Sequence, residues 1–250
     1  MGVEALREKI GVLRAHLRTI TPPDGIRCKS FSDRRGCEHF AFFPGGDGVW
    51  DSDRGVVTTI VLASDWGNEA SFGRLIARRK YTDEATIRNG KPLLQEAGYS
   101  IEDCFFTNAW PLLRSDDMPE SGHHAMRDAT QLTDQCRDFF AETVRLLEPK
   151  LVLTLGKSSA WFVARFVGLN WPAGAFSSAN DVTFRLNDLG SDFVRSINGV
   201  IYVPGTHWSR LNNMTTRWFP NVKSPADYYK AAREAEVALY RRAREAAGIV

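Results

Sequence analysis

Three polar residues stand where apolar, β-branched runs of the chain end, namely Asp65, Asn108 and His207. Runs of this composition predict strands that are buried on both faces of a parallel sheet. The carboxyl ends of parallel strands share one edge of the sheet, where open α/β folds bind their ligands. We therefore expect an acid, an amide and an imidazole to converge at that edge.

These three side chains make a chemically useful set. A carboxylate can orient a water molecule and stabilise a developing cation, and a neutral imidazole can donate to a developing anion. A carboxamide offers both a donor and an acceptor to the edge of a heterocycle. Each residue alone also has a structural interpretation: Asp65 as a helix cap, Asn108 as a turn residue with a satisfied amide, and His207 as a packed loop histidine.

The segments that must position these residues alternate between strands and amphipathic helices. This alternation predicts a three-layer α/β/α sandwich around a central four-stranded, mainly parallel sheet. We expect one domain over residues 1–250, with an N-terminal helix at 3–18 and a long C-terminal helix at 225–247 as additions. The other expected elements are strands at 56–63, 104–108, 151–156 and 200–203, helices at 72–80, 128–148 and 158–167, a helix near Leu93, a short strand at 39–43, loops at 81–92 and 112–127, and a hairpin turn at Asn198-Gly199.

Composition restricts the class of protein. The chain has 250 residues and a formal net charge of +2, which fits one large globular domain. It has no apolar run long enough for a membrane span and no signal-peptide core, so we expect a cytoplasmic protein, nucleoid-associated if the source is prokaryotic. Basic residues form two clusters that can meet phosphates or be solvated helix faces: Arg74, Arg78, Arg79 and Lys80, and Arg241, Arg242 and Arg244.

The cysteines and histidines do not predict a metal site. Cys28, Cys37, Cys104 and Cys136 are too few and too scattered for a disulfide framework. The nine-residue separation of Cys28 and Cys37, with His39 following, matches no compact zinc signature, and we favour unligated thiols. Adjacent His123 and His124 diverge on most backbones, so we expect no metal and no cofactor.

Four segments together are similar, in order and spacing, to the uracil-DNA glycosylase superfamily, over roughly residues 56–215. The segments are Ala63-Ser64-Asp65-Trp66-Gly67-Asn68, Phe106-Thr107-Asn108-Ala109, Pro149-Lys150-Leu151-Val152-Leu153-Thr154-Leu155-Gly156 and His207-Trp208-Ser209-Arg210-Leu211. The resemblance implies an α/β/α domain around a four-stranded parallel sheet. It also implies a monofunctional repair glycosylase that hydrolyses the N-glycosidic bond of uracil, or of a 5-substituted uracil, flipped out of DNA.

The resemblance assigns roles to individual residues. It implies that Asp65 positions water, Asn108 reads the uracil edge and His207 stabilises the departing base. It places Ser64 near the base or phosphate, and Leu211 as the wedge inserted into the duplex. The remaining implied contacts are Trp66, Gly67 and Tyr81 for substrate and Ser209 and Arg210 for DNA.

The sequence also departs from the superfamily pattern. The best-known class has a tyrosine at the position of Gly67, where it blocks C5 of uracil; glycine leaves room for a C5 substituent unless Trp66 or Asn68 fills it. Tyr81, and after it Phe72, is the nearest candidate for stacking on the base. One branch carries an iron–sulfur cluster on four cysteines, and Cys136 has a similar Cys-Arg context. Cys104, however, precedes Asn108 instead of following it, and Cys28 and Cys37 lack close pairing, so we predict no cluster.

Two other functions remain open from the sequence. The turn after Gly156 resembles a nucleophile elbow, which would combine Ser158 with Asp188 or Asp192 and His207 in a serine hydrolase. Alternatively, the chain is a non-catalytic relative that binds lesions or abasic sites. The expected partner is DNA that contains uracil or a related lesion, with no membrane and a monomeric protein.

Overall fold

A central five-stranded sheet organises the computed structural model, which describes residues 2–30, 55–78, 85–116, 118, 123–168, 195–208 and 224–250. Its strands lie in the order β3-β2-β5-β7-β6. Four of them are parallel, and β6 pairs antiparallel with β7. Their bounds are β2 Thr59–Ala63, β3 Cys104–Asn108, β5 Leu151–Leu155, β6 Arg195–Ile197 and β7 Val200–Gly205.

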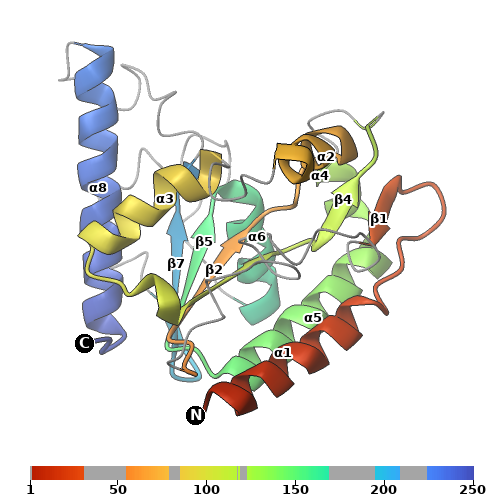
Figure 1. Ribbon diagram of the computed structural model, residues 1–250, viewed down its shortest axis with the longest axis horizontal. Coiled ribbons are helices and arrows are strands. Elements are labelled where there is room, and N and C mark those ends of the chain that lie inside the picture. Colours follow the sequence, from red (N-terminus) through yellow and green to blue (C-terminus); the bar gives the residue numbers. More distant parts are fainter. Residues whose placement is uncertain are drawn as a thin grey trace.

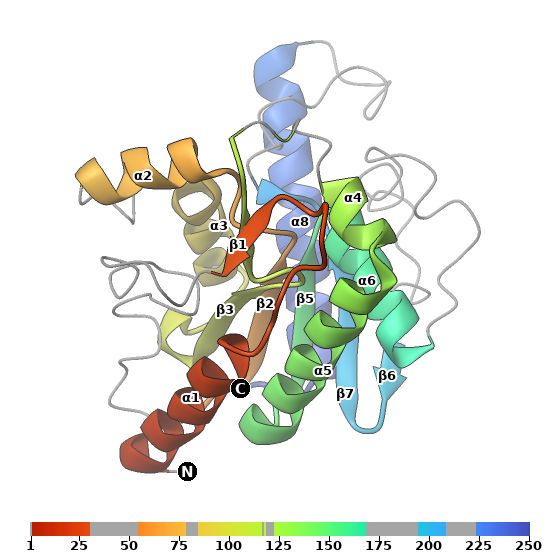
Figure 2. The same ribbon diagram turned by 90° about the vertical axis from the view of Figure 1, so that its right-hand side faces the viewer.

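Helices cover both faces of this sheet, as the two views in Figures 1 and 2 show. On one face lie α1 (Val3–Leu17), α5 (Thr130–Leu147) and α6 (Lys157–Val167). On the other face lie α3 (Ala85–Glu96) and α8 (Pro225–Ala246). The predicted α/β/α sandwich is confirmed. The sheet has five strands instead of four because the first arm of the hairpin at Asn198-Gly199 joins its edge.

The strand register aligns the carboxyl ends of the parallel strands. Ala63 of β2 pairs with Asn108 of β3, and Leu155 of β5 pairs with Gly205 of β7. Every residue of β2, β3 and β5 is buried, as expected for strands with a helix layer on each side. The polar residues that follow these strands therefore emerge along one edge.

Two segments predicted as loops are partly regular. Helix α3 begins at Ala85 and passes through Gly90 and Pro92, because the fully buried Leu93 and Leu94 anchor it to the core. Within 112–127 the structure has β4 (Leu112–Arg114) and α4 (His123–Asp128). The remaining elements are β1 (Cys28–Ser30), α2 (Glu69–Arg78) and the short 3₁₀ helix η3 (Ile101–Asp103).

Strand β4 has a partner that the sequence did not indicate. It pairs antiparallel with β1, with Cys28 opposite Arg114, in a separate two-stranded sheet. Lys29 of β1 forms an ion pair with Glu69 at the start of α2, 3.0 Å apart. This small sheet thus lies beside the segment that follows β2. The predicted strand at 39–43 falls outside the described residues.

Helix α8 begins where the sequence signals a start. Ser224 accepts a hydrogen bond from the backbone N–H of Asp227, and Pro225 occupies the first turn. Among the described helices, none combines the length and the apolar character that a membrane crossing requires.

Candidate active site

Asp65 is fixed in a turn at the end of the central strand β2. Its Oδ1 atom accepts a hydrogen bond from the backbone N–H of Gly67 at 2.6 Å, and the same oxygen lies 3.4 Å from Nε of Arg114. The side chains of Asp65 and Arg114 are only 8% and 12% exposed. Both contacts engage one carboxylate oxygen, so the orientation of the carboxylate is set by the turn and by β4.

Asp65 is not the cap of the helix that follows it. Asn68 accepts a hydrogen bond from the N–H of Ser71 at 2.9 Å, and Asp116 accepts one from the N–H of Ala70 at 2.6 Å. These two side chains occupy the first N–H groups of α2, where caps belong. The helix-cap interpretation of Asp65 is therefore wrong, and Asn68 has the structural role instead.

Asn108 is a buried amide with an unused donor. It is 3% exposed, and its Nδ2 atom has no hydrogen-bond partner within the part of the chain that the structure describes. A buried donor left unpaired costs about 1–3 kcal/mol. No described residue satisfies the N–H₂ group of Asn108, so the interpretation of Asn108 as an internally satisfied turn residue gains no support from this part of the chain.

Ser64 lies directly beside Asn108 on the same edge. The backbone N–H groups of Ala109 and Trp110 donate to the carbonyls of Ala63 and Ser64, at 2.8 and 2.9 Å. The Oγ atom of Ser64 is also buried without a partner among the described residues. Two buried polar atoms that have no partner among the described residues thus lie at this part of the edge.

His207 follows β7 and lies against the end of β5. A Cβ atom built on Gly156 would be 3.2 Å from Cβ of His207, so the glycine makes room for the histidine. Gly156 has a φ of +83°, which glycine adopts without strain. His207 is half-buried, and it is more exposed than its neighbours Thr206 and Trp208.

The sheet order fixes how far apart the three residues are. Asn108, Asp65 and His207 follow β3, β2 and β7, and only β5 separates the last two strands. At about 4.8 Å between neighbouring strands, Asp65 and His207 start about 10 Å apart and Asn108 lies one strand further. The three backbone positions therefore lie along one edge of the sheet, and the convergence of their side chains on one small ring stays a prediction.

Aromatic and glycine residues surround Asp65. Trp66 packs edge-to-face on Phe72, with ring centroids 6.3 Å apart. Phe72 is 1% exposed and packs with Leu113, so it is not available to stack on a base. Gly67 has a φ of +80°, and no described atom lies within 4 Å of the place where its Cβ would be. The other predicted contacts, Tyr81, Ser209, Arg210 and Leu211, lie outside the described residues.

The hydrolase alternative does not fit the position of Ser158. A nucleophile elbow places its serine on a strained turn before a helix. Ser158 instead lies inside α6, and it is not among the described residues with positive φ. Asp188 and Asp192, the proposed acids of that triad, lie outside the described residues.

Three of the four cysteines lie among the described residues. Cys104 opens β3, about 13 Å from Asn108 at the other end of that strand. Cys28 lies near Asp65: burial first, and then the Asp65 charge, raise the pKa of its thiol to about 12. Burial also raises the pKa of the Cys136 thiol, with a smaller contribution from Cys28. Cys37 and His39 lie outside the described residues.

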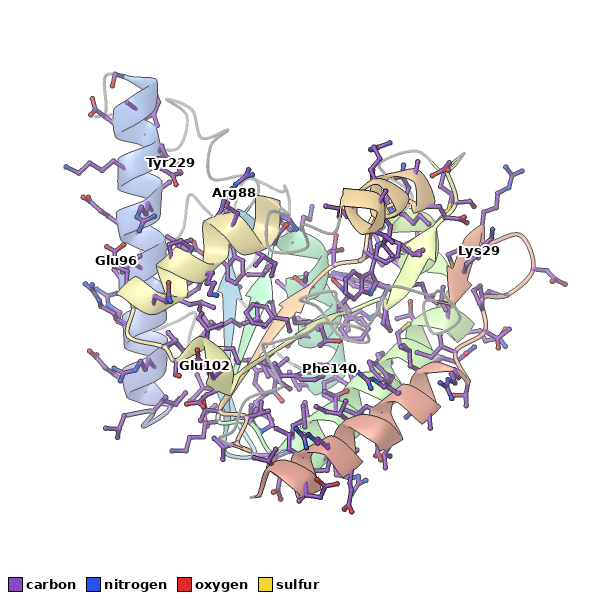
Figure 3. The ribbon with its side chains drawn as sticks, in the orientation of Figure 1. Lys29, Arg88, Glu96, Glu102, Phe140 and Tyr229 are labelled. Atoms are coloured by element: carbon purple, nitrogen blue, oxygen red, sulfur yellow. The ribbon has the colours of Figure 1, made fainter. Side chains whose placement is uncertain are left out.

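The C-terminal basic cluster has a structural role at the other end of the molecule. Arg241 donates to the carbonyl of Glu96 at the end of α3, 3.0 Å away, and Arg244 lies against Gly98. Arg74, by contrast, is exposed on α2 beside the Asp65 turn. Figure 3 shows Arg88 near the upper end of α3, toward the same edge of the sheet.

Three residues that sequence reasoning missed support this edge. Arg114 contacts Asp65, while Glu236 and Tyr240 of α8 contact the residues on both sides of His207. Glu236 looked like a surface acid in the sequence, because only the structure shows that its helix position is buried between Ala232 and Tyr240. Arg114 gave no signal, because its partner comes from strand pairing across the chain.

The model of the uracil DNA glycosylase superfamily matches residues 71–235, more than half of the chain. This chain belongs to the uracil-DNA glycosylase superfamily. The matched region contains Asn108 and His207 and begins shortly after Asp65. No curated protein matches the chain. Membership of the superfamily implies DNA binding and a DNA glycosylase activity in base excision repair.

Proposed function

We propose that this protein is a DNA glycosylase that hydrolyses the N-glycosidic bond of uracil flipped out of DNA. The observation that carries the proposal is the buried Asn108 amide, whose Nδ2 lacks a partner among the described residues, at the edge that also holds Asp65 and His207. Uracil presents an acceptor at O4 and a donor at N3, which match the donor and acceptor of a carboxamide. Uracil would thus pair the buried donor of Asn108.

The proposed reaction is a displacement by water. The bond between C1′ and N1 breaks, and its electron pair leaves with uracil as an anion, while the water oxygen bonds to C1′. Asp65 would face the cationic sugar and orient the water molecule. The proton that this water loses would pass through Asp65 to solvent. His207 would donate a hydrogen bond to uracil O2 as negative charge develops there, and solvent then protonates the base.

Within the described residues, the contacts of Asp65 involve only one of its two carboxylate oxygens. Gly67 and Arg114 both contact Oδ1, which leaves Oδ2 as the atom that we assign to the water. Arg114 would then act as a clamp that keeps the carboxylate from rotating. Because hydrolysis by water forms no covalent enzyme intermediate, the product expected is an intact strand with an abasic site.

We propose that 5-substituted uracils are also substrates. Gly67 occupies the position at which the best-known class has a blocking tyrosine, and no described atom lies within 4 Å of its missing Cβ. Excision of 5-hydroxymethyluracil within about tenfold of the uracil rate supports an open pocket. Rejection by a hundredfold or more contradicts it, since a closed pocket excludes the substituent.

Exposed cations near the edge fit the DNA backbone. Arg74 on α2 and Lys91 on α3 are exposed. If Arg74 or Lys91 binds a phosphate, its substitution by alanine should make the slope of log K against log salt shallower by about 1. Arg242→Ala is the matched control, because Arg242 is exposed near the C-terminal end of α8, between the two arginines that contact the end of α3.

Single-turnover cleavage of a panel of oligonucleotides tests the proposed function. The panel contains uracil, 5-hydroxymethyluracil, a thymine mismatch, hypoxanthine and an abasic site, and each is scored for binding and for cleavage. Excision of uracil to an alkali-sensitive site supports the proposal. Tight binding of a lesion or an abasic site without release of any base favours the non-catalytic relative and overturns it.

A further inference from the structure

A buried acid on the C-terminal helix holds the strand end that carries His207. Glu236 of α8 is fully buried, and its Oε1 atom accepts a hydrogen bond from the backbone N–H of Thr206 at 2.9 Å. The same oxygen accepts a hydrogen bond from the hydroxyl of Tyr240 at 2.6 Å. One carboxylate oxygen therefore joins the end of β7 to α8.

The residue after His207 is held by the same pair. The indole N–H of Trp208 donates to the hydroxyl of Tyr240 at 2.8 Å, and Trp208 is fully buried. Its carbonyl accepts from Nδ2 of Asn89 on α3, 3.3 Å away. His207 is thus flanked on both sides by residues fixed to α8, while its own side chain is more exposed.

The hydrogen bonds that join Glu236 and Tyr240 to Thr206 and Trp208 form an anchor, and close packing leaves it little room to move. A Cβ atom on Gly205 would lie 2.9 Å from both Glu236 Oε1 and the Tyr240 hydroxyl. A Cβ atom on Gly90 would lie 1.7 Å from the Trp208 ring. The glycines on β7 and α3 are therefore required for α8 and Trp208 to approach this closely.

Burying a carboxylate for stability alone is unfavourable. The Oε2 atom of Glu236 has no hydrogen-bond partner among the described residues, and an apolar side chain at this helix position would avoid that cost. A charge-assisted hydrogen bond to a backbone N–H gives a more fixed geometry than apolar contact does. Such an acid fits a position where geometry matters more than stability.

We propose that Glu236, together with Tyr240, is a positioning residue that sets the place of His207 for catalysis. The proposal rests on the function proposed above, because it holds that the hydrogen bonds of Glu236 and Tyr240 set the orientation of the His207 side chain. Transition-state contacts depend on placement within fractions of an ångström, and a misplacement of about 1 Å can reduce a rate about a hundredfold.

The anchor also depends on the proton of Glu236. Burial raises the pKa of Glu236 to about 7, although the Tyr240 and Thr206 hydrogen bonds act in the opposite direction. The titratable groups around it are Tyr240 and, through the Tyr240 carbonyl, Tyr99, and burial raises the pKa of both. The charge of Cys104 raises the pKa of Tyr99 further, and the charge of Arg244 lowers it. Ionised Glu236 accepts a charge-assisted hydrogen bond from the Thr206 N–H, so this one hydrogen bond becomes stronger as the pH rises through neutrality, although burial of the charge lowers the stability of the fold.

Single-turnover excision of uracil by Glu236→Ala, Glu236→Gln and Tyr240→Phe tests this. We expect Glu236→Ala to slow the chemical step tenfold to a hundredfold with DNA affinity changed less than threefold. Glu236→Gln keeps an acceptor for Thr206, so we expect the wild-type rate below about pH 6 and a severalfold lower rate above about pH 8. Glu234→Gln, exposed on the same helix, is the matched control and leaves the profile unchanged.

A double-mutant cycle tests whether Glu236 affects the excision rate through His207. If Glu236 acts through His207, Glu236→Ala costs no further rate once His207→Ala is present. Full additivity of the two losses, or a Glu236→Gln pH profile that superimposes on the wild type, overturns the proposal. So does a Glu236→Ala rate equal to that of the Glu234→Gln control.

One readout does not need activity. In His207→Ala, where no imidazole titrates beside the strand end, we expect the backbone amide resonance of Thr206 to shift with an inflection near pH 7, and the further change Glu236→Gln to abolish it. If the protein excises no uracil but this inflection is present, the proposed function fails and the anchor stands. If excision is present and the inflection is absent, the anchor fails and the function stands.

Discussion

The buried acid on α8 gives a prediction about stability that can be worked out from the structure. Glu236 has a pKa of about 7 in the folded protein against an ordinary 4.5, with burial as the main cause. The folded state therefore holds this proton more tightly than the unfolded state does. The stability that this provides is fully present below about pH 4.5 and is lost as the pH rises through about 7.

The size of this loss follows from the difference in pKa. At about 1.4 kcal/mol per pH unit, raising the pKa from 4.5 to about 7 corresponds to about 3 kcal/mol. Glutamine at this position has the same shape and no proton to lose. We therefore expect the free energy of unfolding of Glu236→Gln, relative to wild type, to rise by about 3 kcal/mol between about pH 4 and pH 8.

Urea unfolding of both proteins across this pH range measures the effect. The comparison uses only the change with pH, so any constant cost of the glutamine side chain cancels. Glu234→Gln, whose side chain is 63% exposed, should give a difference that is flat with pH. A flat difference for Glu236→Gln, or one that falls as the pH rises, would refute the burial argument.

The other predictions concern the sheet edge. Asp65→Asn and His207→Ala should each slow single-turnover excision of uracil about 10²–10³-fold. Asp134→Asn on α5 and His16→Ala on α1 are the controls and should leave the rate unchanged. A wild-type rate in Asp65→Asn or His207→Ala would remove the role assigned to that residue. Asn108→Ala should abolish discrimination for uracil while changing the free energy of unfolding by less than about 1 kcal/mol, because its Nδ2 gives up no hydrogen bond to a described residue; a large loss of stability in thermal unfolding would mean that the amide is structural. Gly90→Ala should destabilise by about 1–3 kcal/mol and slow excision, since the added methyl displaces Trp208; an unchanged melting temperature and rate would contradict this packing.

The sequence determined the elements and the residues that end them. The period of apolar residues depends only on local geometry, so the four parallel strands and the helices at both ends of the chain were predicted to within a few residues. The breaks at Asp65 and Asn108, and the turn to His207, were visible because polar residues are rare inside strands that are buried on both faces. The four segments that resemble the superfamily were found by their order and spacing.

Pairing between distant segments could not be predicted in this way. Strand β4 pairs with β1 across the chain, and only this pairing brings Arg114 to Asp65. The sheet order β3-β2-β5-β7-β6 likewise decides which polar residues are neighbours. Neither follows from local pattern, because strand pairing depends on which edges are free when the sheet assembles.

Tertiary packing also overrode two local signals. Gly90 and Pro92 predicted a loop, but α3 continues through both residues. Residue 90 is a glycine because the Trp208 ring packs where a Cβ atom would be. Glu236 resembles any surface acid in the sequence, and its role exists only because α8 packs on the end of β7 and removes its carboxylate from water. The free energy of a charge depends on its surroundings, and only the folded chain supplies them.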